Sequence, residues 1–221
     1  MQKIELLKSR AECNDIAAMV DLGLYYLREE GSVHDTIHWW EKAANAGNVK
    51  AIHNLVGLYA DPEVDAAANS EEFLKWLKML VYYVKDGKAM VILGALLSGN
   101  QRGHIMWRRA FEPDVFEKYK DVDEAFRLIE EALALESVGQ ASLDRYDYDA
   151  IANAYYFRSG GFANGNVFDL QNSLKYREKV LSLMPHERQD LCELTRRSIS
   201  DLKRIIQLSP PQGQSSPSRL S

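Results

Sequence analysis

The sequence predicts an all-α fold, and three observations support this. The 221 residues include only 13 Gly and 6 Pro, and three of the prolines lie in the last twelve residues, so helix-breaking residues are rare elsewhere. Alanine, leucine and tyrosine recur at spacings of four residues, which places them on one face of a helix. A line of small and aromatic residues also repeats: Ala18 and Ala51 are 33 residues apart, and Trp39 and Trp76 are 37 apart. A period of this length is typical of helix pairs that stack into a solenoid.

The first repeat, residues 12–47, carries the pattern most completely. Its first helix contains Ala18, Leu22, Gly23 and Tyr26, a turn follows at Gly31, and its second helix contains Trp39, Lys42, Ala43, Ala44 and Gly47. Trp39 is predicted to be the aromatic anchor of the second helix. Glycine lowers helix propensity. We therefore expect a neighbouring helix to cross closely at Gly23, and also at Gly94 in the third repeat.

Three further repeats and a closing helix follow. The predicted boundaries are residues 48–85, 86–136 and 147–183 for the repeats, 185–208 for a C-terminal capping helix and 209–221 for a disordered tail. The anchors of the later repeats are predicted at Trp76, Leu128 and Tyr176. Two helix starts resemble capping boxes, Asn69 with Glu72 and Asp121 with Glu124. The capping helix is expected to hold Pro185 in its first turn and to bury a stripe of Leu191, Leu194, Ile199, Leu202 and Ile206.

Composition and charge narrow the class of protein. There are 27 basic and 32 acidic residues, and the net charge of −5 argues against a dedicated nucleic-acid binder. The longest apolar run, residues 89–97, is far shorter than the ~20 residues of a membrane helix, and the first nine residues lack the apolar core of a secretory signal. Two cysteines near opposite ends, Cys13 and Cys192, suit a reducing compartment. We therefore expect a cytoplasmic protein with no membrane contact and no nucleic-acid partner.

The repeated residues resemble the Sel-one-like repeat family, which is related to the tetratricopeptide repeats. The consensus pattern of that family is A-x-x-x-L-G-x-x-Y-x-x-G followed by A-x-x-W-x-x-K-A-A-x-x-G. The residues that match it are Ala18, Leu22, Gly23, Tyr26, Trp39, Lys42, Ala43, Ala44 and Gly47. Ala51, Leu55, Tyr59, Trp76, Ala89, Leu93 and Gly94 match it in part, and the match is weak from about residue 121 to 181. The resemblance implies a right-handed α/α solenoid, a bacterial source and a role as a scaffold for protein–protein contacts.

The chain departs from this family pattern in the third repeat, where Leu97 and Leu128 are 31 residues apart. Insertions in solenoids collect on one face, which is often the binding face. This insertion contains a basic and aromatic cluster, Arg102, Trp107, Arg108 and Arg109, of residue types that are common interface hot spots. The cluster is a candidate docking site for an acidic segment of a partner. Alternatively, its arginines pair with carboxylates of this chain and its tryptophan packs on a neighbouring helix.

The concave side of the solenoid is a second candidate surface. By analogy with tetratricopeptide repeats, the first helix of each pair lines this side, three and seven residues after the motif alanine. The positions selected in this way are Asp21, Tyr25, Asn54, Leu58, Ile92 and Leu96. They change from polar to apolar along the predicted groove, which suits an extended peptide or a partner helix.

No residue pattern points to catalysis. His34 and His38 are four residues apart, but structural zinc sites use four convergent ligands, and no third ligand is near in the sequence. No Ser or Cys has the surroundings of a nucleophile, and the glycines near residue 160 lack the Lys-Ser/Thr of a phosphate loop. We therefore expect no metal, no cofactor and no enzyme activity.

Taken together, these patterns predict a monomeric, non-catalytic scaffold or adaptor. It is expected to bind a partner protein through the concave groove and the third-repeat insertion, for example as an antitoxin, an immunity protein or a regulator. Two alternatives stay open. One is a small-molecule- or metal-dependent enzyme with a pocket at the insertion, and the other is a structural subunit of a larger assembly.

Overall fold

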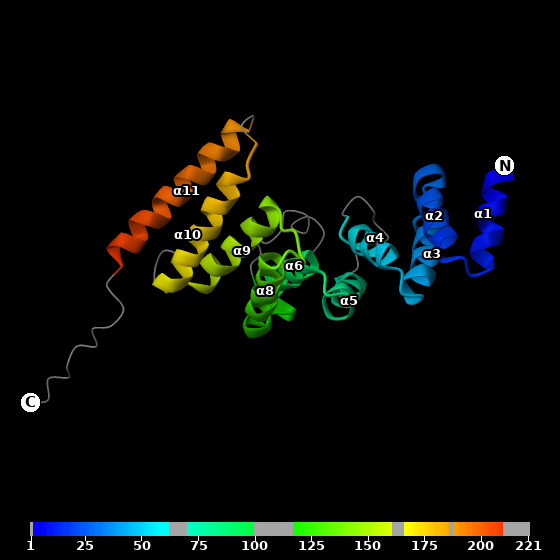
Figure 1. Cartoon of the computed structure of the whole chain (residues 1–221), viewed down its shortest axis with the longest axis horizontal. Helices are drawn as coiled ribbons and strands as arrows, with labels where there is room; N and C mark the ends of the chain where they lie inside the picture. The colour runs from blue at the N-terminus through cyan, green and yellow to red at the C-terminus, as the bar shows by residue number, and fades with distance from the viewer. Residues whose placement is uncertain (1, 62–69, 100–116, 161–165, 186–187, 210–221) are drawn as a thin grey trace, which may run out of the picture. The chain divides into compact units, whose positions relative to one another are not determined.

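A computed structural model describes residues 2–61, 70–99, 117–160, 166–185 and 188–209. These residues form helices joined by loops, and no strand occurs among them. The all-α class predicted from the sequence is therefore confirmed. The chain divides into two compact units, unit 1 (Met1–Ser142) and unit 2 (Leu143–Ser221) (Figure 1).

Unit 1 is a succession of helices that pack against their neighbours in the chain. They are α1 (Gln2–Glu12), α2 (Ile16–Tyr25), η1 (Tyr26–Glu30), α3 (Val33–Asn45), α4 (Val49–Tyr59), α5 (Ser70–Met79), η2 (Leu80–Val84), α6 (Gly87–Leu97) and α8 (Val122–Ser137). Each of the helices α1 to α4 packs against the helix that follows it, and α6 packs against α8. Helices α2 and α5 end in the π-helical turns η1 and η2.

Unit 2 contains, over its described residues, α9 (Arg145–Arg158), α10 (Val167–Ser182) and α11 (Gln189–Leu208). Helix α10 packs against both of the others. Between α9 and α10 the ring of Tyr176 stacks on Tyr148 and on Tyr155, at centroid distances of 6.2 and 5.8 Å. The buried carboxylate of Asp169 accepts hydrogen bonds of 2.6 and 2.9 Å from Arg158. Aromatic stacking and a paired buried charge thus hold α9 against α10.

The helix pairs of the predicted repeats are present in the structure. Helices α2 and α3 lie within residues 12–47, α4 and α5 within 48–85, and α6 and α8 within 86–136, while α9 and α10 match the fourth pair. Helix α1 precedes the first predicted repeat and packs against α2. The right-handed solenoid and the number of repeats stay predictions.

The predicted capping helix differs from α11 at its start and on its apolar face. Helix α11 begins at Gln189, so Pro185 precedes it instead of lying in its first turn. Ile199 and Leu202 are buried, but Leu194 is 60 % exposed. Leu194 lies five residues before Ile199, which rotates it about 140° around the helix and away from the buried side.

Side chains cap the first turn of most helices in both units. Asp15, Ser32, Asn48, Asp86, Asp121, Asp144 and Asn166 each accept a hydrogen bond from a backbone N–H of that turn. The predicted capping box at Asp121 and Glu124 is half formed, because the backbone N–H of Asp121 donates to the carbonyl of Leu97 instead of the Glu124 side chain. Asn69, predicted to cap α5, lies outside the described residues.

A tight crossing holds α3 against α2. The indole ring of Trp40 covers Gly23 so closely that a Cβ on Gly23 would lie 2.4 Å from Cδ1 of Trp40. The indole Nε1–H of Trp40 donates to the carbonyl of Val20 at 3.0 Å, and the hydroxyl of buried Thr36 donates to the carbonyl of Gly23 at 3.2 Å. The close crossing expected at Gly23 is therefore confirmed.

The anchor of this crossing is Trp40, and the prediction of Trp39 was wrong. Trp40 is buried, whereas Trp39 is partly exposed and has the ammonium of Lys42 4.6 Å from its ring centroid. Consecutive helical residues point about 100° apart, so only one of the two indoles faces α2. The anchors predicted for the later repeats, Trp76, Leu128 and Tyr176, are buried.

The crossing of α6 and α8 uses glycine in the same way. A Cβ on Gly94 would lie 2.8 Å from the carbonyl oxygen of Ala125 and 2.9 Å from Cγ1 of Ile129. The expectation for Gly94 is also confirmed. In both crossings the missing Cβ lets the next helix approach closely. The stabilisation from this contact outweighs the low helix propensity of glycine.

We predict that Gly23→Ala destabilises the protein, although alanine favours helices. The added methyl collides with Trp40, and overpacking of this kind costs ~1–3 kcal/mol, against a gain of about 1 kcal/mol in propensity. Gly57→Ala in α4 is the matched control, because no atom lies within 4 Å of a Cβ built there. Urea denaturation followed by circular dichroism should give a lower midpoint for Gly23→Ala and a higher one for Gly57→Ala. A higher midpoint for both variants would contradict this explanation.

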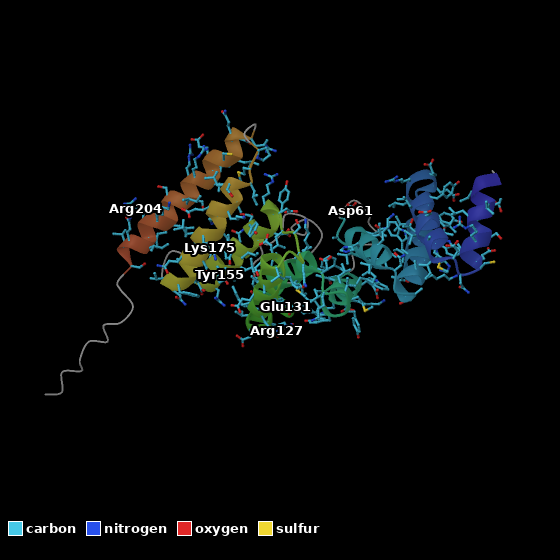
Figure 2. All side chains as sticks on the ribbon, in the orientation of Figure 1. Asp61, Arg127, Glu131, Tyr155, Lys175 and Arg204 are labelled. Carbon is cyan, nitrogen blue, oxygen red and sulfur yellow. The ribbon has the colours of Figure 1, made fainter. Side chains whose placement is uncertain are left out.

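A polar network joins η2 to α8. The hydroxyl of Tyr82 donates to Glu124 at 2.7 Å, and Arg127 donates two hydrogen bonds of 2.7 Å to the same carboxylate. Arg127 also donates to Glu131 at 2.9 Å (both labelled in Figure 2), and Lys85 lies 3.3 Å from Glu131. The pKa of Glu124 is lowered to about 2, mainly because Arg127 donates hydrogen bonds to its carboxylate. Partial burial raises the pKa and so opposes this shift, and the hydrogen bond from Tyr82 lowers it further.

This network predicts a loss of stability in acid. Glu124 ionises near pH 4.5 in an unfolded chain but near pH 2 in the folded protein. Its stabilising effect is therefore fully present above about pH 4.5 and disappears as the pH falls through 2. The difference in Tm between wild type and Glu124→Gln should be constant above pH 5 and shrink between pH 4.5 and 2. A difference that does not change with pH would show that the carboxylate charge is unimportant.

Candidate functional site

An open groove of about 460 Å³ lies between α1 and α2 in unit 1. Its lining residues are Leu6, Leu7 and Arg10 from α1, and Asp21, Leu24, Tyr25, Arg28 and Glu29 from α2 and η1. Leu6 is 63 % exposed, and Leu7, Leu24 and Tyr25 are partly exposed. The groove therefore combines apolar and aromatic surface with charges of both signs.

A short turn holds α1 beside the start of α2. Asn14 takes the left-handed conformation, with φ of 64°, and the backbone N–H of Asp15 donates to the carbonyl of Arg10. The carboxylate of Asp15 accepts a hydrogen bond from the N–H of Ala18 and two more from Arg10, at 2.6 and 2.9 Å. The bond from Ala18, followed by those from Arg10, lowers the pKa of Asp15. Arg10 is thus already paired with a carboxylate of its own unit.

The wall from α2 is a single helical stripe. Asp21, Leu24, Tyr25 and Arg28 are spaced by three and four residues, so they share one face of the helix. The adjacent side of α2, which includes Leu22, is buried. After Tyr25 the helix widens into η1, which ends at a left-handed glycine, and both Arg28 and Glu29 line the groove.

Tyr25 lies at the centre of the stripe. Its ring packs edge to face on Tyr26 at 5.9 Å, and the ammonium of Lys8 lies 6.0 Å from the Tyr26 ring. Burial raises the pKa of Tyr25, and the carboxylates of Glu30 and Glu29 raise it further. The phenol is therefore neutral at physiological pH, and its hydroxyl donates to the carboxylate of Glu30.

Asp21 and Arg28 stand at the two ends of the stripe. Both side chains are exposed, and neither forms an ion pair or a side-chain hydrogen bond with the part of the chain that the structure describes. Within the described residues, one end of the stripe therefore carries a negative charge and the other a positive charge that have no ion-pair partner, with Leu24 and Tyr25 between them.

The structure places the concave-side residues predicted from the sequence in different surroundings. Tyr25 lies in the groove, and Asn54 and Ile92 are half-buried on α4 and α6. Leu58 and Leu96 are only 6 % and 1 % exposed, because both belong to the core of unit 1. They have no surface to offer a partner, and we leave them out of the contact surface proposed below.

The basic and aromatic cluster of the third-repeat insertion lies outside the described residues. This applies to Arg102, Trp107, Arg108 and Arg109 alike. The pocket expected at the insertion in the enzyme alternative falls on the same segment.

Sequence reasoning missed the whole α1 wall of the groove. Ile4, Leu7 and Ala11 recur at the helical spacings of three and four, and Ala11 is buried. This stripe is the signal that predicts a helix packed in front of the first repeat. Of the two leucines that α1 contributes to the groove, Leu6 is the more exposed.

His34 and His38 are both exposed, and no group of three or more His, Cys, Asp or Glu in the described ranges is placed to bind a metal ion. None of the described helices has the length and apolar character needed to cross a bilayer. Comparisons of the chain with protein-family models, with curated proteins and with solved structures found no match.

Proposed function

We propose that this chain is a non-catalytic protein–protein interaction module, and that the α1–α2 groove is a contact surface for its partner. The observation that supports the proposal is the lining of the groove, in which Leu6 is 63 % exposed and Asp21 and Arg28 have no ion-pair partner among the described residues. The resemblance to Sel-one-like repeats supports the same role. We further propose that the protein works in a reducing compartment such as the cytoplasm, which suits the two free thiols of Cys13 and Cys192.

The shape of the groove favours a macromolecule over a small ligand. Small-molecule sites enclose most of their ligand in a largely apolar cavity. This groove is open, and half of its lining side chains are charged. A stripe with the spacing of residues 21, 24, 25 and 28 suits a second helix laid along α2. Both walls are helices already folded in the free chain, so binding would cost little conformational entropy.

Leu6→Asp should abolish partner binding without unfolding the protein. The substitution puts a charge into the apolar part of the groove, at a side chain that is 63 % exposed. Val138→Asp is the matched control, because Val138 is 67 % exposed in the same unit and does not line the groove. The measurement is affinity capture from a lysate of the native host, quantified by mass spectrometry, with circular dichroism to verify the fold.

The outcomes separate the candidate surfaces. A protein captured by wild type and by Val138→Asp, but reduced at least tenfold with Leu6→Asp, would support the groove. Equal capture by all three would remove the groove from the proposal. In that case a fourth variant, Arg108→Glu/Arg109→Glu, tests the predicted docking site in the third-repeat insertion. Loss of binding only in this variant would place the contact there.

A further inference from the structure

We propose that the partner in the α1–α2 groove is a second copy of this chain, with the two α2 helices packed antiparallel across a twofold axis. The inference rests on the proposed function, because it names the occupant of the same groove. It departs from the monomer expected from the sequence. The order of charged and apolar side chains along α2 and η1 supports a second copy as the partner.

The α2 stripe is complementary to itself in the antiparallel direction. Its order along the chain is acidic, apolar, aromatic and basic: Asp21, Leu24, Tyr25 and Arg28. In an antiparallel pair centred between positions 24 and 25, residue 21 faces residue 28 of the other helix, because the two positions are equally far from that centre. Asp21 therefore meets Arg28 of the partner subunit, and Leu24 meets Tyr25 of the partner subunit. A twofold axis makes each contact twice.

Asp21 and Arg28 are the charged residues of the α2 stripe itself, and Arg10 and Glu29 are the other charged residues that line the groove. Arg10, the other cation of the groove, is held by two hydrogen bonds to Asp15. Glu29, the other anion, follows Arg28 in η1 and lines the groove at the same end of the stripe. Asp21 and Arg28 have no ion-pair partner among the described residues, and they stand about 10 Å apart along the helix axis by the rise of seven residues. Two copies supply the missing partner of each.

The apolar side chains also gain from this arrangement. Helices α1 and α2 form a two-helix layer with a groove between them, and two such layers packed face to face form a four-helix arrangement. Leu6, which is 63 % exposed in the single chain, would be covered by the opposite layer together with Leu7. Tyr25 would contribute a large ring and a hydroxyl, a combination that is enriched at interfaces.

The test is a charge swap measured by sedimentation velocity over a concentration series of the purified full chain. Asp21→Arg places a like charge opposite Arg28 of the partner subunit, and Arg28→Asp does the same opposite Asp21. Each single substitution should raise the dimer Kd at least tenfold, because opposed like charges disfavour association. The double variant D21R/R28D restores both pairs, and its Kd should return to within about threefold of wild type. Circular dichroism controls for folding.

Three results would overturn the inference. The first is a wild-type chain that stays monomeric up to about 1 mM. The second is a dimer whose Kd is unchanged by either single substitution or by Leu6→Asp. The third is a double variant that dissociates as readily as the single ones. Failure of this inference is distinguishable from failure of the proposed function. A monomeric chain that loses a captured heterologous protein through Leu6→Asp would keep the groove as a contact surface and exclude only the second copy as its partner.

Discussion

The packing of unit 1 depends on two helical glycines, Gly23 and Gly94. Because glycine has no Cβ, the following helix can place a large side chain or its own backbone in that space. Trp40 occupies that space beside Gly23, and the backbone at Ala125 occupies it beside Gly94. The close approach at Gly23 also brings polar groups into range, so that the indole N–H of Trp40 reaches the carbonyl of Val20. Steric fit and hydrogen bonding are thus two results of the same missing methyl group. A buried indole N–H without an acceptor would be costly, which makes the register of α3 on α2 specific.

This constraint on the buried side of α2 also determines its exposed side. With α3 fixed against Gly23, the stripe from Asp21 to Arg28 points away from α3, and the turn at Asn14 and Asp15 places α1 beside it. The groove is therefore made of side chains whose backbone is held by packing on the other face. That is the condition under which a few exposed residues can give a defined contact, since little of the surface must be ordered on binding.

Periodicity predicted the helices and their order, because spacings of three and four residues leave a clear signal when one face is buried. It could not choose between Trp39 and Trp40, since both fit an aromatic position and only the phase of α3 on α2 decides which is inside. Counting from the motif alanine selected Tyr25 for the concave side of a solenoid, and this residue lines the α1–α2 groove, but the same counting also selected Leu58 and Leu96, which are buried. Burial there depends on contacts with later helices, which counting along one helix does not include. The groove itself needed α1, whose short stripe was not recognised.

Hydrogen exchange of the backbone amides in wild type and Trp40→Phe tests whether α2 and α3 are stabilised as one element through Trp40. The substitution keeps an aromatic ring beside Gly23 and removes the donor to Val20, a loss of ~1–2 kcal/mol, or roughly tenfold in protection. We predict that protection falls by a similar factor throughout α2 and α3, while α9 and α10 serve as an unchanged reference. A loss confined to α3, with α2 still fully protected, would show that Trp40 does not couple the two helices.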